Sequence, residues 1–228
     1  MIFGGFEKCT LIDYPGKIAC MVFTIGCNFR CPYCHNPELV DETVEKTYSE
    51  KEVLDFLDRR KNMLDAVVIT GGEPTMHSDL IHFLQQVKDR GFLIKLDSNG
   101  THPGMLAEII DKKLVDYIAM DIKSPLSKYS QTVARPVDIV AIKKSINLLL
   151  HSYIEYEFRT TIIKSLLSSE DIEEIGREIY GAKKYYLQKF IPTKILNPQF
   201  RKKVTYTDIE LDQFREKVKH NVHVCEIR

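Results

Sequence analysis

Short apolar runs alternate with amphipathic stretches along most of the chain. The apolar runs are rich in β-branched residues and short enough to be buried strands, whereas apolar residues recur at helical spacing in the stretches between them. The predicted strands are Lys17–Thr24, Asp65–Thr70, Phe92–Asp97, Val115–Asp121, Glu155–Ile163 and Lys184–Ile191. The predicted helices are Ser49–Lys61, Ser78–Arg90, one that begins at Pro103, Asp138–His151 and Ser169–Tyr180. This alternation predicts an α/β fold with a parallel sheet and right-handed crossovers.

The predicted domain organisation is a single domain, residues 1–228. There are about six strand–helix units, fewer than the eight that close a barrel. A leading hairpin or flap over 1–16 precedes a core over 17–192. The extension over 193–228 carries a last helix, Thr207–Lys219, and a short strand, Val222–Ile227.

The composition is that of an ordinary globular protein. Of the 228 residues, 44% are hydrophobic and 28% are charged, and 32 basic residues balance 32 acidic ones. This balance provides no electrostatic argument for a nucleic-acid or membrane partner. The first ten residues do not form a signal peptide, and no apolar run reaches the length of a membrane span. We therefore expect a cytoplasmic protein without a nucleic-acid or membrane partner.

Three of the six cysteines, Cys27, Cys31 and Cys34, lie on one loop directly after the first predicted strand. A disulfide is disfavoured because three thiols leave one unpaired. Zinc suits the Cys-x-x-Cys spacing, with His35 or a distant residue as the fourth ligand. An iron–sulfur cluster also suits three thiolates, and it would leave one iron open to a substrate or cofactor. The residues alone leave both readings open.

Further polar clusters follow the next three predicted strands. They are Gly71-Gly72-Glu73, Asp97-Ser98-Asn99-Gly100 and Asp121-Ile122-Lys123. Since the carboxyl ends of parallel strands share one face, these clusters and the cysteine loop are expected to converge on one site. Taken singly, the first also fits a tight turn with a solvated glutamate, the second an Asx turn and the third a surface ion pair.

The cysteine spacing, with Tyr33 before the last cysteine, resembles the radical S-adenosylmethionine signature. The wider run Cys-Asn-Phe-Arg-Cys-Pro-Tyr-Cys-His-Asn-Pro resembles the activating enzymes of glycyl-radical enzymes, and among them most of all those of anaerobic ribonucleotide reductase. The resemblance extends from Gly4 to about Pro192. It implies a partial (β/α)6 barrel and a 4Fe-4S cluster held by the three cysteines. Because no other cysteine follows Cys34 until Cys225, we expect one cluster only.

The resemblance also implies roles for individual residues around bound S-adenosylmethionine. Gly71, Gly72 and Glu73 match the motif that binds the methionyl amino group. The other two clusters match motifs near the methionyl carboxylate and the ribose, and a monovalent cation is expected near Asp97 and Asp121. The remaining expected cofactor contacts are Tyr33 at the adenine, His35, Ser98, Asn99, Lys123, Arg159 and Gln188. Gln188 or Phe190 stands where some relatives have a histidine, and Arg159 points either into the pocket or to a neighbouring carboxylate.

The expected function is that of an activating enzyme. It cleaves S-adenosylmethionine reductively and generates a glycyl radical on a partner enzyme, for which the resemblance suggests anaerobic ribonucleotide reductase, with a flavodoxin- or ferredoxin-type electron donor. One alternative is a radical enzyme that acts on a small molecule or nucleotide. A second alternative, from another class, is a zinc-stabilised binding module without catalysis.

Overall fold

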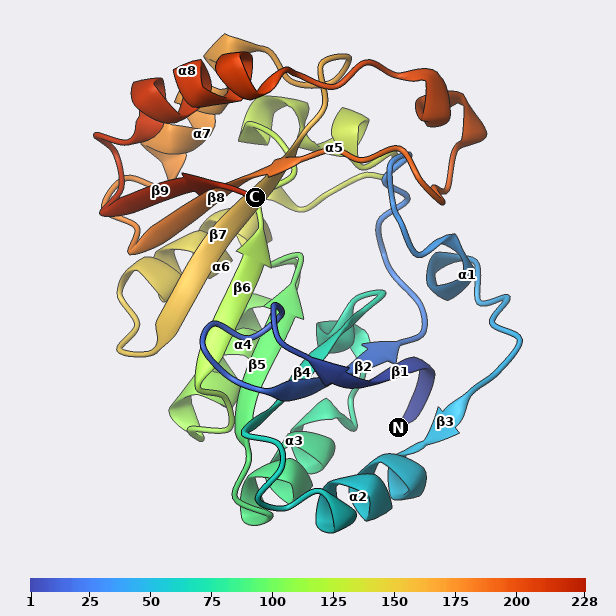
Figure 1. The fold of residues 1–228 in the computed structure, drawn as a ribbon. Coiled ribbons are helices and arrows are strands. Elements are labelled where there is room, and N and C mark those ends of the chain that lie inside the picture. The colour runs from blue at the N-terminus through green and yellow to red at the C-terminus, as the bar shows by residue number, and fades with distance from the viewer. The chain divides into compact units, whose positions relative to one another are not determined.

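Two groups of residues make most of their contacts internally in the computed structural model, which describes residues 1–228 (Figure 1). The first unit comprises Met1–Asn28, Glu38–Ser98 and His102–Ile118. The second comprises Phe29–Pro37, Asn99–Thr101 and Ala119–Arg228. The cysteine loop is therefore divided, with Cys27 in the first unit and the other two cysteines in the second.

The first unit contains a five-stranded sheet with the order β3-β1-β2-β4-β5. Strand β1 is antiparallel to β2 and β3, whereas β2, β4 and β5 are mutually parallel. The strands are β1 (Ile2–Thr10), β2 (Ala19–Thr24), β3 (Tyr48–Ser49), β4 (Ala66–Gly71) and β5 (Leu93–Ser98). The helical segments are α1 (Pro37–Val40), α2 (Glu50–Arg59), η1 (Pro74–Met76), α3 (Leu80–Asp89) and α4 (Pro103–Asp111). Residues 1–16, where a hairpin or flap is expected, contain the single strand β1, which pairs in antiparallel fashion with the first core strand, β2.

The second unit contains the parallel strands β7 (Glu155–Ile162), β8 (Lys184–Lys189) and β9 (Val224–Ile227), in that order. Strand β6 (Tyr117–Asp121) contributes residues to both units. The helical segments are η2 (Leu126–Lys128), α5 (Tyr129–Thr132), α6 (Ile139–Leu150), α7 (Ser169–Glu178), η3 (Pro198–Lys202) and α8 (Asp208–Val218). The predicted strands and helices of this region are confirmed to within a few residues at their ends.

Local capping chemistry explains where some helices begin. Ser49 and Glu52 form the capping box that the sequence predicts for α2, because each satisfies a backbone N–H that the first turn leaves free. The sequence predicts a cap at Ser78 for α3, and the cap residue is Asp79, one position later. The 3-10 turn η1, which precedes it, is capped by Glu73.

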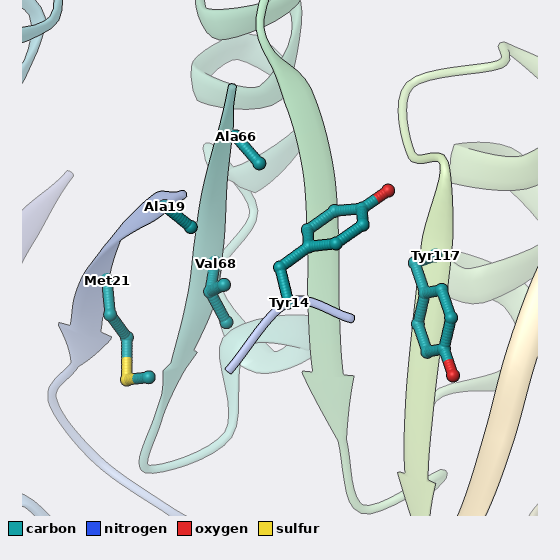
Figure 2. Close-up of a cluster of buried hydrophobic side chains, with 6 residues drawn as sticks. All are labelled: Tyr14, Ala19, Met21, Ala66, Val68 and Tyr117. Carbon is teal, nitrogen blue, oxygen red and sulfur yellow. The ribbon is translucent and has the colours of Figure 1, made fainter. Parts of the chain in front are cut away.

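The inner face of the first unit's sheet carries a buried apolar cluster. Paired positions on β2 and β4, such as Met21 and Val68, supply part of it. Tyr14, from the segment that joins β1 to β2, lies between these side chains and Tyr117, with the two tyrosine rings 5.8 Å apart (Figure 2). The predicted turn at Asp13–Gly16 therefore also contributes a core residue, since Tyr14 is buried.

The helices of both units differ from membrane-spanning helices. None combines the length and the apolar character that crossing a bilayer requires.

A carboxyl group on α7 makes the stability of the second unit depend on pH. The Leu126 N–H donates to Glu178 Oε1 at 2.9 Å, but Glu178 Oε2 is buried without a hydrogen-bond partner. Burial raises the pKa of Glu178 to about 7. Because the folded carboxyl holds its proton more tightly than the unfolded one, its contribution to stability decreases as the pH rises from about 4.5 to about 7.

We expect Glu178→Gln to stabilise the protein at pH 8 by about 1–3 kcal/mol, and to have little effect at pH 5. The amide removes the cost of ionising a buried carboxyl and keeps an oxygen for the Leu126 N–H. Denaturant unfolding of the variant and of the unmodified chain at both pH values measures the difference. An equal effect at pH 5 and pH 8 would show that ionisation of Glu178 is not the cause.

Candidate cofactor site

The first cysteine of the loop lies beside the end of β4. After β2 ends at Thr24, the Gly26 N–H donates to the Leu39 carbonyl oxygen at 2.8 Å. The Glu73 N–H donates to the Gly26 carbonyl oxygen, also at 2.8 Å. Cys27, the next residue, is partly exposed. Backbone hydrogen bonds thus fasten the start of the cysteine loop to the Gly-Gly-Glu segment.

Both glycines of that segment are required by close backbone contacts. A Cβ atom on Gly72 would lie 1.8 Å from the Gly26 carbonyl oxygen. A Cβ atom on Gly71 would lie 2.3 Å from the Thr24 nitrogen, and Gly71 has a φ of 119°. Such positions admit only glycine. The sequence predicts close approach to a ligand, and the structure adds that these glycines allow two loop backbones to pack together.

The carboxylate of Glu73 is held in place by three donors. It is 1% exposed, so the reading of a turn with a solvated glutamate is wrong. Its Oε1 atom accepts hydrogen bonds from the Thr75 N–H at 3.1 Å, from the Ser98 hydroxyl at 2.9 Å and from the Thr75 hydroxyl. The predicted site residues Glu73 and Ser98 are therefore in direct contact, and the carboxylate is oriented before any ligand binds.

Asp97 lies on the inner face of β5 among further polar groups of the first unit. The Thr70 hydroxyl donates to Asp97 Oδ2 at 3.2 Å. The Lys95 ammonium lies 2.9 Å from Asp97 Oδ1, and Lys95 is 3% exposed. Lys95 is a site residue that our sequence analysis missed. The available signal was a charged residue inside an apolar strand, two positions before Asp97 and therefore on the same face.

The other two cysteines form a tight turn in the second unit. The Cys34 N–H donates to the Cys31 carbonyl oxygen at 3.0 Å. Burial raises the pKa of the Cys31 thiol to about 11, and the nearby Lys123 partly opposes this shift. The C-terminal segment fastens this turn, since the N–H groups of Leu196 and Asn197 donate to the carbonyl oxygens of Cys34 and Pro32, each at 2.9 Å.

Asp121 is the centre of a mostly buried ion-pair network in the second unit. Lys123 Nζ lies 2.9 Å from Oδ2, and Arg159 Nε donates to Oδ1 at 2.9 Å. Burial opposes ionisation, but the Arg159 and Lys123 cations overcome it and lower the pKa of Asp121 to about 2. Of the two orientations considered for Arg159, the structure shows the one toward a carboxylate. The Asp121–Lys123 pair is mostly buried and is not a surface ion pair.

The same network continues to residues that the sequence did not single out. Glu157, which is fully buried, receives two hydrogen bonds from Arg228, at 3.0 and 3.3 Å. The guanidinium of Arg228 stacks on the Tyr186 ring at 3.3 Å. Arg159 Nη1 lies 4.0 Å from Glu157. Alternating charges thus connect β6, β7 and the residue that follows β9.

The remaining predicted residues lie in the second unit. Tyr33 is 4% exposed, and burial raises the pKa of its hydroxyl well above the usual value. His35 Nε2 lies 2.8 Å from the Ile191 carbonyl oxygen, and its ring stacks on Phe190 at 6.0 Å. Gln188 is half-buried on β8, opposite Thr161. Asn99 accepts a hydrogen bond from the Thr101 N–H at 3.0 Å, as in the Asx turn that was the alternative to a role in cofactor binding.

The donor set fits an iron–sulfur cluster. It consists of three thiols within residues 27–34, and thiolates are the usual cluster ligands. The structure gathers no group of three or more His, Cys, Asp or Glu side chains into a metal site. His35, the candidate fourth ligand of a zinc site, has its Nε2 atom 2.8 Å from the Ile191 carbonyl oxygen.

Comparison with known protein families identifies the family of this chain. The model of the radical SAM superfamily matches residues 21–179. This chain belongs to the radical SAM superfamily. Members of that superfamily use a 4Fe-4S cluster and S-adenosylmethionine, so the resemblance seen in the cysteine motif is confirmed and the chain is a radical SAM enzyme.

Two relatives show how far the similarity extends. A Methanocaldococcus jannaschii protein with the provisional name of glycyl-radical enzyme activating enzyme is 37% identical over 208 residues, which are 87% of this chain and 83% of that protein. The pyruvate formate-lyase-activating enzyme of Clostridium pasteurianum is 35% identical over 122 residues, 51% of this chain and 50% of that enzyme.

Solved structures of other radical SAM proteins share the fold. Streptococcus suis SuiB bound to S-adenosylmethionine matches with a TM-score of 0.69 at 16% identity, over 89% of this chain and 48% of SuiB. A radical SAM methyltransferase from Sphaerobacter thermophilus matches with a TM-score of 0.68 at 16% identity, over 96% of this chain and 68% of that chain. The predicted α/β class with parallel strands is confirmed, and these neighbours are consistent with the expected partial barrel.

Proposed function

We propose that this radical SAM enzyme activates a glycyl-radical enzyme. The observation that carries the proposal is the similarity to the M. jannaschii activating enzyme, which extends over 87% of this chain and 83% of that protein. When bound, the reduced cluster and S-adenosylmethionine supply a carbon-centred radical, which takes a hydrogen atom from a glycine of the partner. The protein contributes ligands, orientation of the cofactor and exclusion of water.

The cysteines Cys27, Cys31 and Cys34 are the proposed cluster ligands. Lys123 supports this role at Cys31, because a nearby cation favours the thiolate over the thiol. The fastening of the loop by backbone hydrogen bonds at Gly26 and at Cys34 holds the ligands in place without using their side chains.

The proposed binding groups for S-adenosylmethionine follow the motifs. Gly71, Gly72 and Glu73 bind the methionyl amino group, for which the anchored carboxylate of Glu73 provides a fixed negative charge. Cationic groups on either side of Asp121 suit the methionyl carboxylate and the ribose. The other proposed contacts are Tyr33, His35, Asp97, Ser98, Asn99, Lys123, Arg159 and Gln188.

Anaerobic ribonucleotide reductase is the proposed partner, with a flavodoxin- or ferredoxin-type electron donor and a cytoplasmic location. The chain is proposed to work as one domain. The choice of partner follows from the motif around the cysteines, which resembles the activating proteins of that reductase more than those of other glycyl-radical enzymes.

An anaerobic radical assay tests the proposed function. Reduced, reconstituted protein is mixed with S-adenosylmethionine and, separately, with purified ribonucleotide reductase, pyruvate formate-lyase and other glycyl-radical enzymes. Electron paramagnetic resonance should show the doublet of a glycyl radical, strongest with the reductase. Absence of a doublet with every partner, together with turnover of a nucleotide, would contradict the proposal and support a radical enzyme for small molecules.

We expect Glu73→Gln to weaken binding of S-adenosylmethionine by about 10- to 100-fold, with normal iron content. The amide keeps the acceptor for Thr75 and Ser98 but loses the charge that attracts an ammonium group, and a hydrogen bond to a charged group is worth about 1.5–3 kcal/mol. Equilibrium binding and iron analysis of the same preparation measure both quantities. Glu108→Gln, on the exposed side of α4, is the matched control. Loss of iron from Glu73→Gln would refute the role given to this carboxylate.

A further inference from the structure

Lys95 is a buried lysine in an apolar environment. It is 3% exposed, and its neighbours in β5, Ile94 and Leu96, are fully buried. On the inner face of the sheet it pairs with Val68, which in turn pairs with Met21. Removing an ammonium group from water in this way is costly unless an opposite charge lies against it. A lysine at this position therefore calls for a specific partner.

That partner is Asp97. The Lys95 ammonium lies 2.9 Å from Asp97 Oδ1, and the two side chains are 4% and 15% exposed. Thr70 donates to the other carboxylate oxygen, and the Tyr117 ring centre lies 6.0 Å from the ammonium. The positively charged Lys95 ammonium thus already lies against one oxygen of Asp97, on the side that faces the core of the first unit.

A monovalent cation was also expected near Asp121. Protein cations neutralise this carboxylate too. Within the second unit, Asp121 has Lys123 on one oxygen and Arg159 on the other, each at 2.9 Å. An alkali cation binds through several oxygen ligands, and a neighbouring ammonium or guanidinium repels it. The residues around Asp97 and those around Asp121 therefore do not fit a bound monovalent cation.

We propose that Lys95 is a built-in counter-cation of Asp97 and takes the place of a monovalent metal ion. Asp97 then keeps its charge and its orientation in sodium- or potassium-free solution. The further consequence, that binding of S-adenosylmethionine needs no added monovalent cation, rests on the proposed function. The pairing of Asp97 with Lys95 affects the stability of the folded chain whether or not S-adenosylmethionine is bound.

Thermal unfolding in different salts tests the proposal. The melting temperature is measured in choline chloride and in potassium chloride at equal ionic strength, without S-adenosylmethionine. The unmodified chain should melt at the same temperature in both salts. Lys95→Met keeps most of the side chain but removes the ammonium group and its charge. Its melting temperature should rise by about 3 °C between 0 and 100 mM potassium, because Asp97 without Lys95 now binds the ion.

Two further variants identify the source of the response. Lys112→Met removes an exposed lysine on the same unit and should respond to potassium as the unmodified chain does. Lys95→Met combined with Asp97→Asn should lose the potassium response, because the carboxylate that Lys95 neutralises is no longer present.

Either of two results would overturn the proposal. The first is a folded Lys95→Met variant that shows no potassium response. The second is a saturable potassium response of the unmodified chain that Asp97→Asn removes, and this measurement decides the question even if Lys95→Met does not fold. Because neither measurement involves the cluster, the partner enzyme or S-adenosylmethionine, failure here is distinct from failure of the proposed activity.

Discussion

Replacing Cys31 with alanine is expected to abolish both cluster binding and cleavage of S-adenosylmethionine. Cys31 is one of only three thiols on the loop, and a cluster held by two thiolates is expected to be lost. The residue is also 7% exposed, so no solvent-borne ligand readily replaces its sulfur. Anaerobically reconstituted variant protein should contain little iron, lack the cluster absorbance and form no 5′-deoxyadenosine under reducing conditions.

Cys9→Ala provides the matched control for this experiment. Cys9 is exposed on β1 and has no neighbour at ligand spacing, so its replacement should leave iron content and cleavage unchanged. Retention of a full cluster by Cys31→Ala would refute the ligand assignment. Zinc without iron in the anaerobically isolated chain would refute the cluster itself.

Regular elements and local caps could be predicted because their causes lie within a few residues. The capping box of α2 needs only Ser49 and Glu52, which are neighbours in sequence. The 3-10 turn η1 could not be predicted in this way. Glu73 caps that turn and is also tied to Ser98 on β5, which is a contact between residues distant in sequence.

The site shows the same division between local and distant causes. The motif residues could be located because the polar clusters follow apolar strands at the end where parallel sheets collect such groups. The residues that contact these motif residues could not be located in this way. Lys95 lies inside a strand and is explained only by its contact with Asp97, and Leu196 reaches the cysteine turn from the C-terminal segment. In both cases the cause is a tertiary contact, and the only sequence signal was the charged Lys95 inside an apolar strand.

The contact between Gly72 and Gly26 leads to the second large expected effect. Gly72→Ala should destabilise the protein by about 3 kcal/mol, since overpacking costs about 1–3 kcal/mol and occasionally more, and the new Cβ would lie 1.8 Å from a backbone oxygen that has no rotamer to move away. For a chain of this size the melting temperature should fall by about 6–12 °C. Iron content should also fall, because Gly26 precedes Cys27 and would be displaced.

Gly104→Ala separates this clash from the general effect of replacing a glycine. Gly104 lies in α4, and a Cβ there meets nothing within 4 Å. Alanine should therefore stabilise the helix by about 0.4–1 kcal/mol and leave the iron content unchanged. If Gly72→Ala melts at the temperature of the unmodified chain and binds iron normally, the packing of the Gly-Gly-Glu backbone against the cysteine loop is not what requires glycine. The requirement would then have to come from the approach of a ligand.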